Sequence, residues 1–560
     1  PLKLNIIRMK YSIKSIVIIF LGILTFSFIK SDSPEILLED LEYAQKTIGI
    51  DFTFQEQELM LDGLNDKLKS YKSIREYPLT NDIPPSLIFN PVPPEFYINK
   101  NKRPIHWEIP DNIELPEDKN KLAFYSILEL ASLLKYQKIT SSDLTAFFIK
   151  RLKEHGDTLQ CVITITEKLA TEQAARADRE ISTGNYKGPL HGIPYGVKDL
   201  LAVEGYPTTW GAAPYKDQVI NKTATVVKKL EEAGGVLIAK LTLGALAWGD
   251  VWYGGVTKNP WDLNQGSSGS SAGSASATSA GLVPYSIGSE THGSIVSPST
   301  RCGTTGLRPS YGRVSRTGAM ALSWSMDKLG PICRSAIDCA IVFESINGED
   351  DTDQSLVDAA YNFDWEMGTG SLKIGYLKQI FDENKRNSKN DDRTLEQFKS
   401  MGLNLEPVSL PEDIPVTALS IILNVEAAAA FDELTISGRD SLLVRQIKNA
   451  WPNSFRESRF IPAVEYINAN RIRYELIQEI NAIFKDYDAI ITPSFGGNQG
   501  LITNLTGHPC VVLPNGFDGK ERPTSFSIIG NLFDEEKILR LAMKYQEETN
   551  FEDVHPPLFQ

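Results

Sequence analysis

The sequence contains little cysteine and histidine, with five cysteines and six histidines in 560 residues. An odd number of cysteines in apolar surroundings favours buried free thiols over a disulfide framework. Cys333 and Cys339 lie close together in the chain, but their spacing matches no zinc-binding pattern. The sequence therefore gives no indication of a metal site, and we expect the protein to work without a metal or another cofactor.

The sequence also has fewer basic residues than acidic ones. The chain has 57 Lys and Arg residues against 71 Asp and Glu residues, a formal net charge of -14 and a pI of about 5.1. A polyanion is repelled by this charge, so we expect no nucleic acid partner. The hydrophobic fraction of 42% and the mean hydropathy of -0.20 are typical of a soluble globular protein.

An apolar run near the N-terminus follows basic residues. Lys10 and Lys14 precede residues 16–29, which read IVIIFLGILTFSFI. A basic segment followed by an apolar one of this length is typical of a secretory signal peptide. No clear small-x-small cleavage motif follows, so an uncleaved membrane anchor is the alternative. We expect residues 1–33 to be a signal peptide or membrane anchor, and the protein to be exported, periplasmic or membrane-anchored.

Residues 34–120 show no motif with recognisable chemistry. Apolar residues recur at helical spacing in residues 35–76, which predicts two helices. Residues 78–117 are rich in proline, which predicts an extended segment draped over a surface or serving as a linker. We therefore expect an N-terminal arm made of helices and a Pro-rich segment.

The remaining residues, 121–560, alternate between strand-like and helix-like patterns. Thr140 and Asp143 resemble the capping box that begins a helix, with Asp in place of Glu or Gln. Residues 193–197 form a short apolar run that ends at Lys198. Alternation of strands and helices favours an α/β sheet. Further predicted strands are residues 236–239, 372–377, 489–492 and 510–513, and further predicted helices are residues 168–182, 223–232, 395–401, 463–485 and 535–547.

The stretch from residue 265 to residue 306 has an unusual composition, because about half of it is Gly or Ser. A flexible interdomain tether is one interpretation, but such a linker is polar throughout. Here an apolar run, residues 282–287, interrupts the stretch and is typical of a buried strand. The small residues on either side then mark places where backbone comes close to another group. This is the expected form of an active-site floor with exposed N–H groups and reactive hydroxyls.

Short motifs within and around this stretch occur in a fixed order. Residues 268–274 read SGSSAGS, residues 288–295 read GSETHGSI, and residues 192–199, upstream, read GIPYGVKD. Together they resemble the amidase signature family of Ser-Ser-Lys amide hydrolases, and the resemblance covers about residues 121–560. It implies an α/β amidase-signature fold, with one mixed central β-sheet surrounded by α-helices and an N-terminal helical extension. Further matching segments are residues 303–310, 312–316, 325–327, 330–331 and 334–335.

Amide hydrolysis needs a nucleophile, a base, a proton for the leaving amine and donors for the oxyanion. By resemblance, Ser294 is the nucleophile, Ser270 is the bridging serine that the family holds in a cis peptide bond, and Lys198 is the base. The lysine must be neutral to act, so the site must lower its pKa from about 10.4 by desolvation. Its place at the end of an apolar strand favours this. Without the resemblance, a lysine beside Asp199 would be interpreted as part of a surface ion pair.

The resemblance also implies an oxyanion hole. It would consist of the backbone N–H groups of Thr291, His292, Gly293 and Ser294. A glycine-rich turn can direct several such donors to one point. Removal of one donor typically costs about 10²–10³ in rate.

The sequence departs from the family pattern at several positions. Ala272 and His292 each replace a glycine, Glu290 replaces the usual Asp, and Val296 stands where many members have Arg. Arg301 is the candidate for the charge that Val296 lacks. His292 either binds substrate or fills space, and both interpretations stay open. Residues expected to contact substrate or to support the site are Ser271, Asp199 and Arg301.

A different hydrolase is also compatible with the sequence. Residues 269–273 fit G-x-S-x-G, which would make Ser271 the nucleophile. Such an elbow must follow an apolar strand, whereas residues 259–265 resemble a loop. Its histidine would have to be His508 or His555, and both have ordinary explanations as loop residues.

The main functional expectation is an amidase that hydrolyses a carboxylic amide C–N bond to a carboxylate plus ammonia or an amine. The expected substrate is a small-molecule or peptide amide, and membrane association would occur through the N-terminal segment. One alternative is the glutaminase-type subunit of a tRNA-dependent amidotransferase, which the leader disfavours because those partners are cytosolic. The other alternative, an inactive binding module on the same scaffold, is disfavoured by the presence of Lys198, Ser270 and Ser294.

Overall fold

The computed structural model describes residues 36–385 and 387–560, which fall into two compact units. The first unit ends at Thr80, and the second runs from Asn81 to Gln560. The predicted leader lies outside the described residues, so the expected export or membrane anchoring stays a prediction. The predicted domain boundaries at residues 33 and 120 also stay predictions. Within the described part of the chain, no helix is long and apolar enough to cross a membrane.

The first unit contains the two predicted helices, α2 (Leu38–Ile48) and α3 (Phe54–Glu76). Gly49 ends α2 in the left-handed conformation, with φ of 70°. This conformation is favourable for glycine because it has no Cβ. Thr53 begins α3 with a capping box, in which the Thr53 N–H donates to the Glu56 carboxylate at 2.7 Å.

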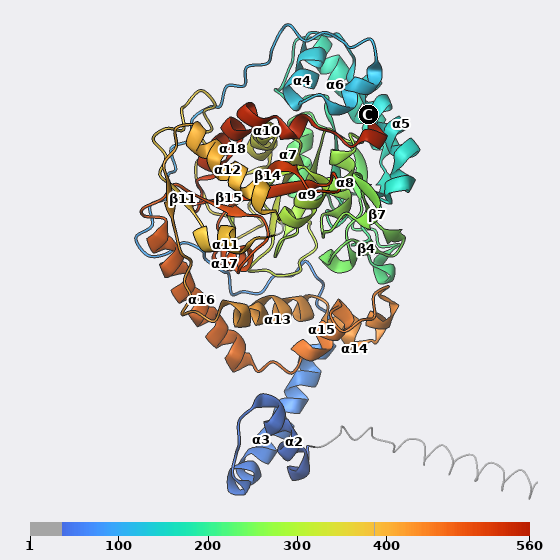
Figure 1. Ribbon diagram of the computed structural model, residues 1–560. Coiled ribbons are helices and arrows are strands. Elements are labelled where there is room, and N and C mark those ends of the chain that lie inside the picture. Colours follow the sequence, from blue (N-terminus) through green and yellow to red (C-terminus); the bar gives the residue numbers. More distant parts are fainter. Residues whose placement is uncertain (1–35, 386) are drawn as a thin grey trace, which may run out of the picture. The chain divides into compact units, whose positions relative to one another are not determined.

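The second unit is built around one mixed sheet of eleven strands, which Figure 1 shows surrounded by helices. The strand order is β1-β3-β2-β8-β10-β9-β14-β15-β13-β11-β12. The predicted α/β class with one central mixed sheet is therefore confirmed. The strands are β1 (Val162–Ile165), β2 (Pro194–Lys198), β3 (Val236–Leu241), β8 (Tyr285–Glu290), β9 (Thr305–Arg308), β10 (Lys328–Cys333), β11 (Ile374–Tyr376), β12 (Leu405–Pro407), β13 (Ala489–Pro493), β14 (Cys510–Phe517) and β15 (Pro523–Gly530).

Short strand pairs and helices complete the second unit. The pairs are β4 (Val251–Trp252) with β5 (Gly255–Val256) and β6 (Lys258–Asn259) with β7 (Asp262–Gly266). The helices are α4 (Ile127–Lys135), α5 (Ser141–Leu159), α6 (Glu167–Ser182), α7 (Thr225–Glu232), α8 (Ala272–Ser279), α9 (Val296–Cys302), α10 (Ala336–Ile346), α11 (Lys378–Glu383), α12 (Ser388–Ser400), α13 (Ile421–Ala430), α14 (Asp432–Ile436), α15 (Trp451–Ser458), α16 (Ala463–Ile483), α17 (Gln499–Thr506) and α18 (Glu535–Thr549). Short 3-10 helices are η1 (Lys119–Phe124), η2 (Ala213–Tyr215), η3 (Ala245–Ala247), η4 (Val416–Ser420), η5 (Arg439–Leu442), η6 (Phe551–Asp553) and η7 (Pro557–Phe559).

The strand register brings two sequence motifs to one edge of the sheet. β2 runs parallel to β8, with Val197 opposite Ile287. Parallel strands end at the same edge, so Lys198 at the end of β2 lies next to the last residues of β8. β8 also pairs with β10, with Glu290 opposite Lys328. The floor of the site therefore lies where the inner strands β2 and β8 end.

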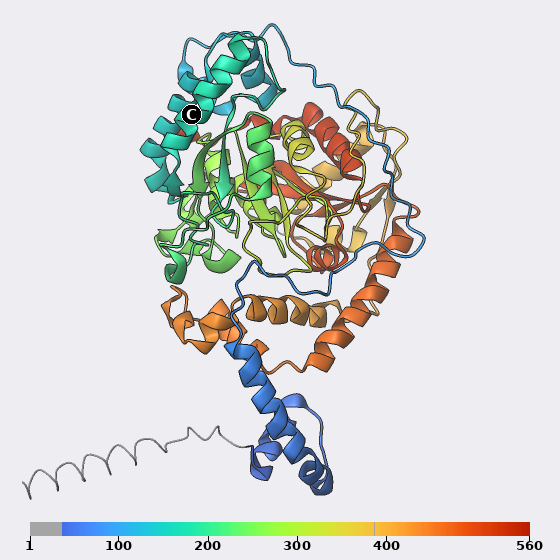
Figure 2. The ribbon, with the colours of Figure 1, turned by 180° about the vertical axis from the view of Figure 1, so that it is seen from behind.

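Residues 81–117 of the Pro-rich segment belong to the second unit and contain no helix or strand. Figure 2 shows it running along the outside of this unit, as predicted for an extended segment. Several contacts tie it down: the Ala360 N–H donates to Asn99 at 2.7 Å, and the Arg103 N–H donates to the Asn362 side chain at 2.7 Å. Polar groups of an extended chain without a strand partner are satisfied in this way.

Candidate active site

Lys198 is fully buried among hydroxyl groups, with 0% of the residue exposed. Its Nζ lies 2.8 Å from Ser270 Oγ, 2.8 Å from Ser289 Oγ and 3.1 Å from Ser271 Oγ. Burial lowers the pKa of Lys198 well below its usual range, against the opposing effect of the nearby acids Asp327 and Glu290. Hydroxyl groups satisfy an amine without neutralising an ammonium, so the neutral form is favoured here.

Ser270 lies in the loop before α8, and the Gly269–Ser270 peptide bond is cis, as the resemblance implies. A Cβ on Gly269 would lie 1.9 Å from the carbonyl oxygen of Gly249, so only glycine fits. The next N–H, that of Ser271, donates to the carbonyl of Ser294 at 3.1 Å. The predicted bridging serine and the predicted nucleophile therefore lie on adjacent, hydrogen-bonded backbone segments.

Ser271 itself supports the floor of the site. Its Oγ accepts from the Ser289 N–H at 3.1 Å and lies 3.0 Å from the Ser289 carbonyl oxygen. Among the described residues, no histidine contacts Ser271: His508 Nδ1 pairs with Thr506 Oγ1 at 2.8 Å, and His555 stacks on a phenylalanine ring. The structure therefore gives no support to the G-x-S-x-G alternative.

The loop that carries Ser294 is fixed by a buried carboxylate. Glu290 accepts from the N–H groups of Ile295 at 2.8 Å and Val296 at 3.0 Å, at the start of α9. The same carboxylate receives Arg308 Nη1 and Asn504 Nδ2, each at 2.9 Å. Burial raises the pKa of Glu290, but the Arg308 charge and these hydrogen bonds outweigh it and hold the pKa at about 2. Glu290 thus stays ionised and anchors both ends of the loop.

The four residues of the predicted oxyanion hole lie on this loop. Thr291 Oγ1 donates to Asp327 at 2.5 Å, and Gly293 has a φ of 80°, which favours glycine. Within the described chain, none of the backbone N–H groups of Thr291, His292, Gly293 and Ser294 donates to a protein acceptor. His292 is exposed, whereas Ser294 is only 8% exposed.

Ser294 opens into a cavity of about 690 Å³. This volume lies within the range of small-molecule sites, about 300–1,000 Å³. Glu290 and Arg308 contribute charge to the lining, but they neutralise each other. Hydroxyl and amide groups from other elements contribute to the lining, among them Ser420, Asn424, Asn449, Ser454, Asn498 and Gln499. Apolar side chains such as Trp248, Leu423 and Trp451 also line the cavity, so its wall is mixed in polarity, and the charges described in it are paired.

Asp199 and Arg301 lie apart from the Lys198 cluster. Asp199 pairs with Lys240 Nζ at 2.7 Å and accepts from the Thr209 N–H at 2.8 Å, and all of these groups are buried. Arg301, in the last turn of α9, lines a smaller cavity of about 90 Å³. The arginine that reaches the Ser294 cavity is Arg308.

Sequence reasoning did not assign roles to Ser289, Asp327, Arg308 or Lys240. The first three lie within or beside the matching motifs, but their roles depend on strand register and not on local spacing. All five cysteines are buried and free, as predicted. In residues 36–385 and 387–560, no group of three or more His, Cys, Asp and Glu side chains is arranged to hold a metal ion.

Comparison with known proteins identifies relatives over most of the second unit. A family model described as Amidase matches residues 143–500. One relative, from the glutamyl-tRNA(Gln) amidotransferase of Nitrosomonas europaea, is 31% identical over 479 residues, covering 77% of this chain and 98% of that relative. A solved amidase family protein from Bacillus anthracis is similar with a TM-score of 0.70 and 26% identity, covering 78% of this chain and 93% of that one. The native peptide amidase from Stenotrophomonas maltophilia is similar with a TM-score of 0.69 and 25% identity, covering 77% and 98%.

Proposed function

The chain belongs to the amidase signature family, and from this premise we propose that it hydrolyses a carboxylic amide to a carboxylate plus ammonia or an amine. Membership makes it an enzyme that hydrolyses or transfers amides. The observation that carries the hydrolytic proposal is the buried Lys198 Nζ, 2.8 Å from Ser270 Oγ, with its pKa lowered by desolvation. A neutral amine in this position can act as a general base.

In the proposed acylation step, Ser294 Oγ attacks the carbonyl carbon of the amide. The Ser294 proton passes to Ser270 Oγ, and the Ser270 proton passes to Lys198 Nζ, which becomes an ammonium. The tetrahedral intermediate then breaks its C–N bond, and the leaving nitrogen takes a proton from Ser270, which Lys198 replenishes. The acyl group stays bound to Ser294 as an ester, and Lys198 is neutral again.

Deacylation follows the same path in reverse. A water molecule attacks the acyl carbon while its proton moves through Ser270 to Lys198. The second tetrahedral intermediate releases the carboxylic acid, and Ser294 recovers its proton from the relay. No other group has to change its net protonation between turnovers.

The oxyanion of both intermediates would be stabilised by the N–H groups of Thr291, His292, Gly293 and Ser294. Support comes from the fact that none of these groups donates to a protein acceptor within the described chain. Glu290 holds the end of the loop, and Asp327 holds Thr291, so the donors are fixed before substrate binds. Donors that need no rearrangement are the effective ones in transition-state stabilisation.

A second candidate function is the glutaminase-type subunit of a tRNA-dependent amidotransferase. It is favoured by the name of the Nitrosomonas europaea relative, and it would bring in the nucleic acid partner that the net charge of -14 disfavours. The Ser294 cavity argues for an uncharged amide, because its described charged lining residues, Glu290 and Arg308, already pair. Ammonia release from glutamine only in the presence of partner subunits, with no turnover of other amides, would establish this second function instead.

The test is turnover of an amide panel by the purified chain and by three serine variants. The acyl-enzyme is detected as a mass increase of the wild-type chain after reaction with an acylating probe. We expect Ser294→Ala to abolish this increase. Ser270→Ala should lower the rate about 10²–10⁴-fold, since the nucleophile survives without general-base help. The losses should not add in the double variant, because residues that act as a unit are not additive. If Ser271→Ala alone eliminates turnover and Ser294→Ala is mild, the assignment is wrong.

A further inference from the structure

A second cavity, of about 680 Å³, lies beside the Ser294 cavity. Ala247, Thr291 and Leu322 line both cavities, so the second one also reaches the loop that carries Ser294. Ser289, a hydroxyl partner of Lys198, lines it as well. Its apolar wall comes from Leu200, Met320, Trp324 and Leu329 and from Leu87, Ile88 and Phe89 of the Pro-rich segment.

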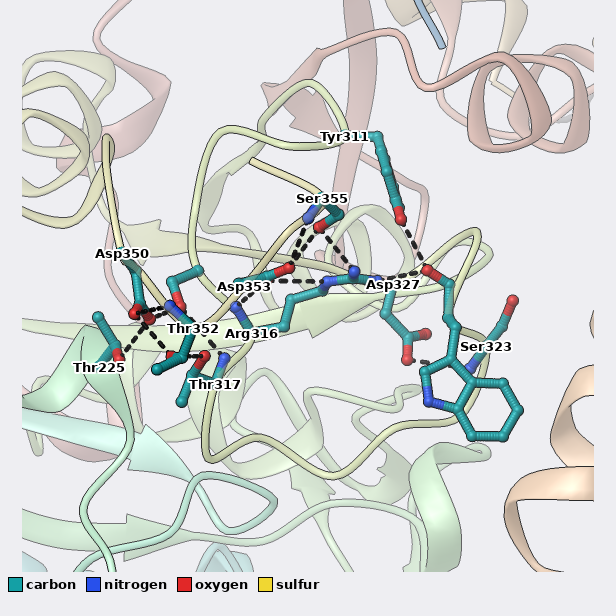
Figure 3. A network of polar contacts seen from close by, with 12 residues as sticks. Thr225, Tyr311, Arg316, Thr317, Ser323, Asp327, Asp350, Thr352, Asp353 and Ser355 are labelled. Carbon is teal, nitrogen blue, oxygen red and sulfur yellow. Dashed lines mark hydrogen bonds and ion pairs between the residues drawn. The ribbon is translucent and has the colours of Figure 1, made fainter. Parts of the chain in front are cut away.

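Four of the five charged groups that line this cavity form ion pairs, and the fifth, Asp327, is held by hydrogen bonds. Arg316 binds Asp353 through its backbone N–H at 2.8 Å and its Nε at 3.4 Å, as Figure 3 shows. Lys222 pairs with Asp82 at 2.7 Å. Asp327 accepts from Thr291 and from two backbone N–H groups. A charged ligand group would have to compete with these ion pairs and hydrogen bonds, whereas an apolar group would not.

One wall of the cavity is held together by hydrogen bonds between side chains. Thr317 Oγ1 lies 2.7 Å from Thr352 Oγ1, and Asp350 accepts from Thr225 Oγ1 at 2.7 Å (Figure 3). Arg316 Nη2 donates to Ser355 Oγ at 2.7 Å. These contacts attach residues 350–355 to α7 and to the segment that carries Arg316, so this wall is held in place.

Another part of the cavity wall is a strap, which we define as residues 81–89. Its first residue is fixed by two hydrogen bonds of 2.8 Å between the Asn81 side chain and the backbone of Ala321. Its last residue, Phe89, has its ring 5.1 Å from the Tyr311 ring and 3.5 Å from the Arg473 guanidinium. Between these anchors, Ile83–Ile88 make no hydrogen bond within the described chain. The strap is therefore held by polar and ring contacts at both ends, whereas its middle lines the cavity without hydrogen bonds.

The middle of the strap exposes large apolar side chains. Leu87 is 85% exposed and Ile88 is 48% exposed, although both line the cavity. Exposed apolar area of this kind is covered favourably by an apolar ligand, because burial removes it from water. The strap precedes residues 143–500, which the family model matches, so the family pattern does not account for it.

We propose that this cavity binds an apolar substituent of the substrate and that the strap closes over it. The substrate class is then an amide that carries an alkyl or aryl group on one side of its C–N bond. This inference rests on the proposed amidase function, since it places the reacting bond at Ser294. The strap supplies specificity and takes no part in the chemistry.

The test compares three amides: acetamide, octanamide with its chain on the acyl side, and N-octylacetamide with its chain on the amine side. The strap variant is the double substitution Leu87→Asn and Ile88→Asn, at positions exposed enough to leave the core intact. We expect the wild-type chain to prefer one octyl substrate. In the strap variant, the kcat/KM ratio of that substrate to acetamide should fall about tenfold or more, as typical for lost apolar contacts. The control is Leu558→Asn, an equally apolar position that is 60% exposed and does not line this cavity, where the ratio should not change.

Failure of this inference can be separated from failure of the proposed function. Equal turnover of octyl amides and acetamide, or unchanged ratios in the strap variant, overturns the inference while hydrolysis itself stands. If no amide is turned over, the function fails, and octanamide binding to the Ser294→Ala chain is measured by calorimetry instead. N-octylacetamide binding is measured in the same way. Binding of either octyl amide that the strap substitutions weaken supports the cavity assignment, and absent or unaffected binding of both refutes it.

Discussion

We predict that the buried carboxylate of Glu290 links stability to the proposed catalysis, and Glu290→Gln tests that prediction. The pKa of Glu290 falls from its ordinary value of 4.5 to about 2, because Arg308 and the hydrogen bonds outweigh burial. Each pKa unit corresponds to about 1.4 kcal/mol, so ionised Glu290 contributes about 3 kcal/mol to the free energy of unfolding. This value is consistent with other buried ion pairs, in which removal of one partner typically lowers the free energy of unfolding by about 3–5 kcal/mol. We expect Glu290→Gln to lose about 3 kcal/mol at neutral pH.

The contribution of Glu290 to the free energy of unfolding should depend on pH in a defined direction. A carboxyl whose folded pKa is depressed stabilises fully above its unfolded pKa, and it loses this contribution as the pH falls through the folded value. The stability difference between wild type and Glu290→Gln should therefore be largest above about pH 4.5 and should shrink toward about pH 2. Denaturant unfolding followed by tryptophan fluorescence at several pH values measures it.

The control is Glu475→Gln, an exposed carboxylate on α16, which should leave the free energy of unfolding within about 0.5 kcal/mol. Amide turnover should also fall in Glu290→Gln, because the N–H groups of Ile295 and Val296 lose a charged acceptor. If Glu290→Gln matches wild type in stability at neutral pH, the argument that this pair anchors the Ser294 loop is refuted.

Two further predictions concern the base and the leader. The proposed base Lys198 must be neutral to act. Amide turnover should therefore increase as the pH rises through the lowered pKa of Lys198, and decrease as the pH falls below it and the amine becomes protonated. Lys198→Met, which keeps the side-chain length, should lower the rate about 10²–10⁴-fold while the chain stays folded by thermal unfolding, and a near-wild-type rate would show that the base lies elsewhere. Residues 10–29 should direct export or membrane anchoring of the native protein, which N-terminal sequencing and cell fractionation check. Recovery in the cytosolic fraction with the leader intact would contradict this.

The sequence correctly predicted helices and strands that are marked by patterns within a few neighbouring residues. The apolar run before Lys198 became β2, and Thr140 does begin α5, accepting the N–H of Asp143 at 3.0 Å. The helix predicted over residues 463–485 became α16 (Ala463–Ile483). In each case periodicity or capping chemistry within a few residues was sufficient.

The predictions were less accurate where partners decide the structure. The strand predicted over residues 282–287 is β8, Tyr285–Glu290, shifted toward Gly, Ser and Glu residues of low strand propensity. Its pairing with β10, a strand that itself contains Pro331, overrides propensity. This shift placed Ser289 and Glu290 inside the sheet, next to Lys198. The partners of Glu290, Arg308 and Asn504, lie 18 and 214 residues away in the chain, so spacing could not reveal them.

The distribution of buried charge explains why Lys198 is suited to be a base and not part of an ion pair. Its chain neighbour Asp199 is a carboxylate, yet successive residues of an extended chain point to opposite sides. Asp199 therefore meets Lys240 of the adjacent strand, 2.7 Å away, and Lys198 meets the three serine hydroxyls. Glu290 is likewise paired with Arg308. Asp327, the acid with the largest opposing effect on the pKa of Lys198, is held by hydrogen bonds from Thr291 and two backbone N–H groups. Desolvation is nevertheless the largest effect on the pKa of Lys198, and it favours the neutral amine that the proposed general base requires.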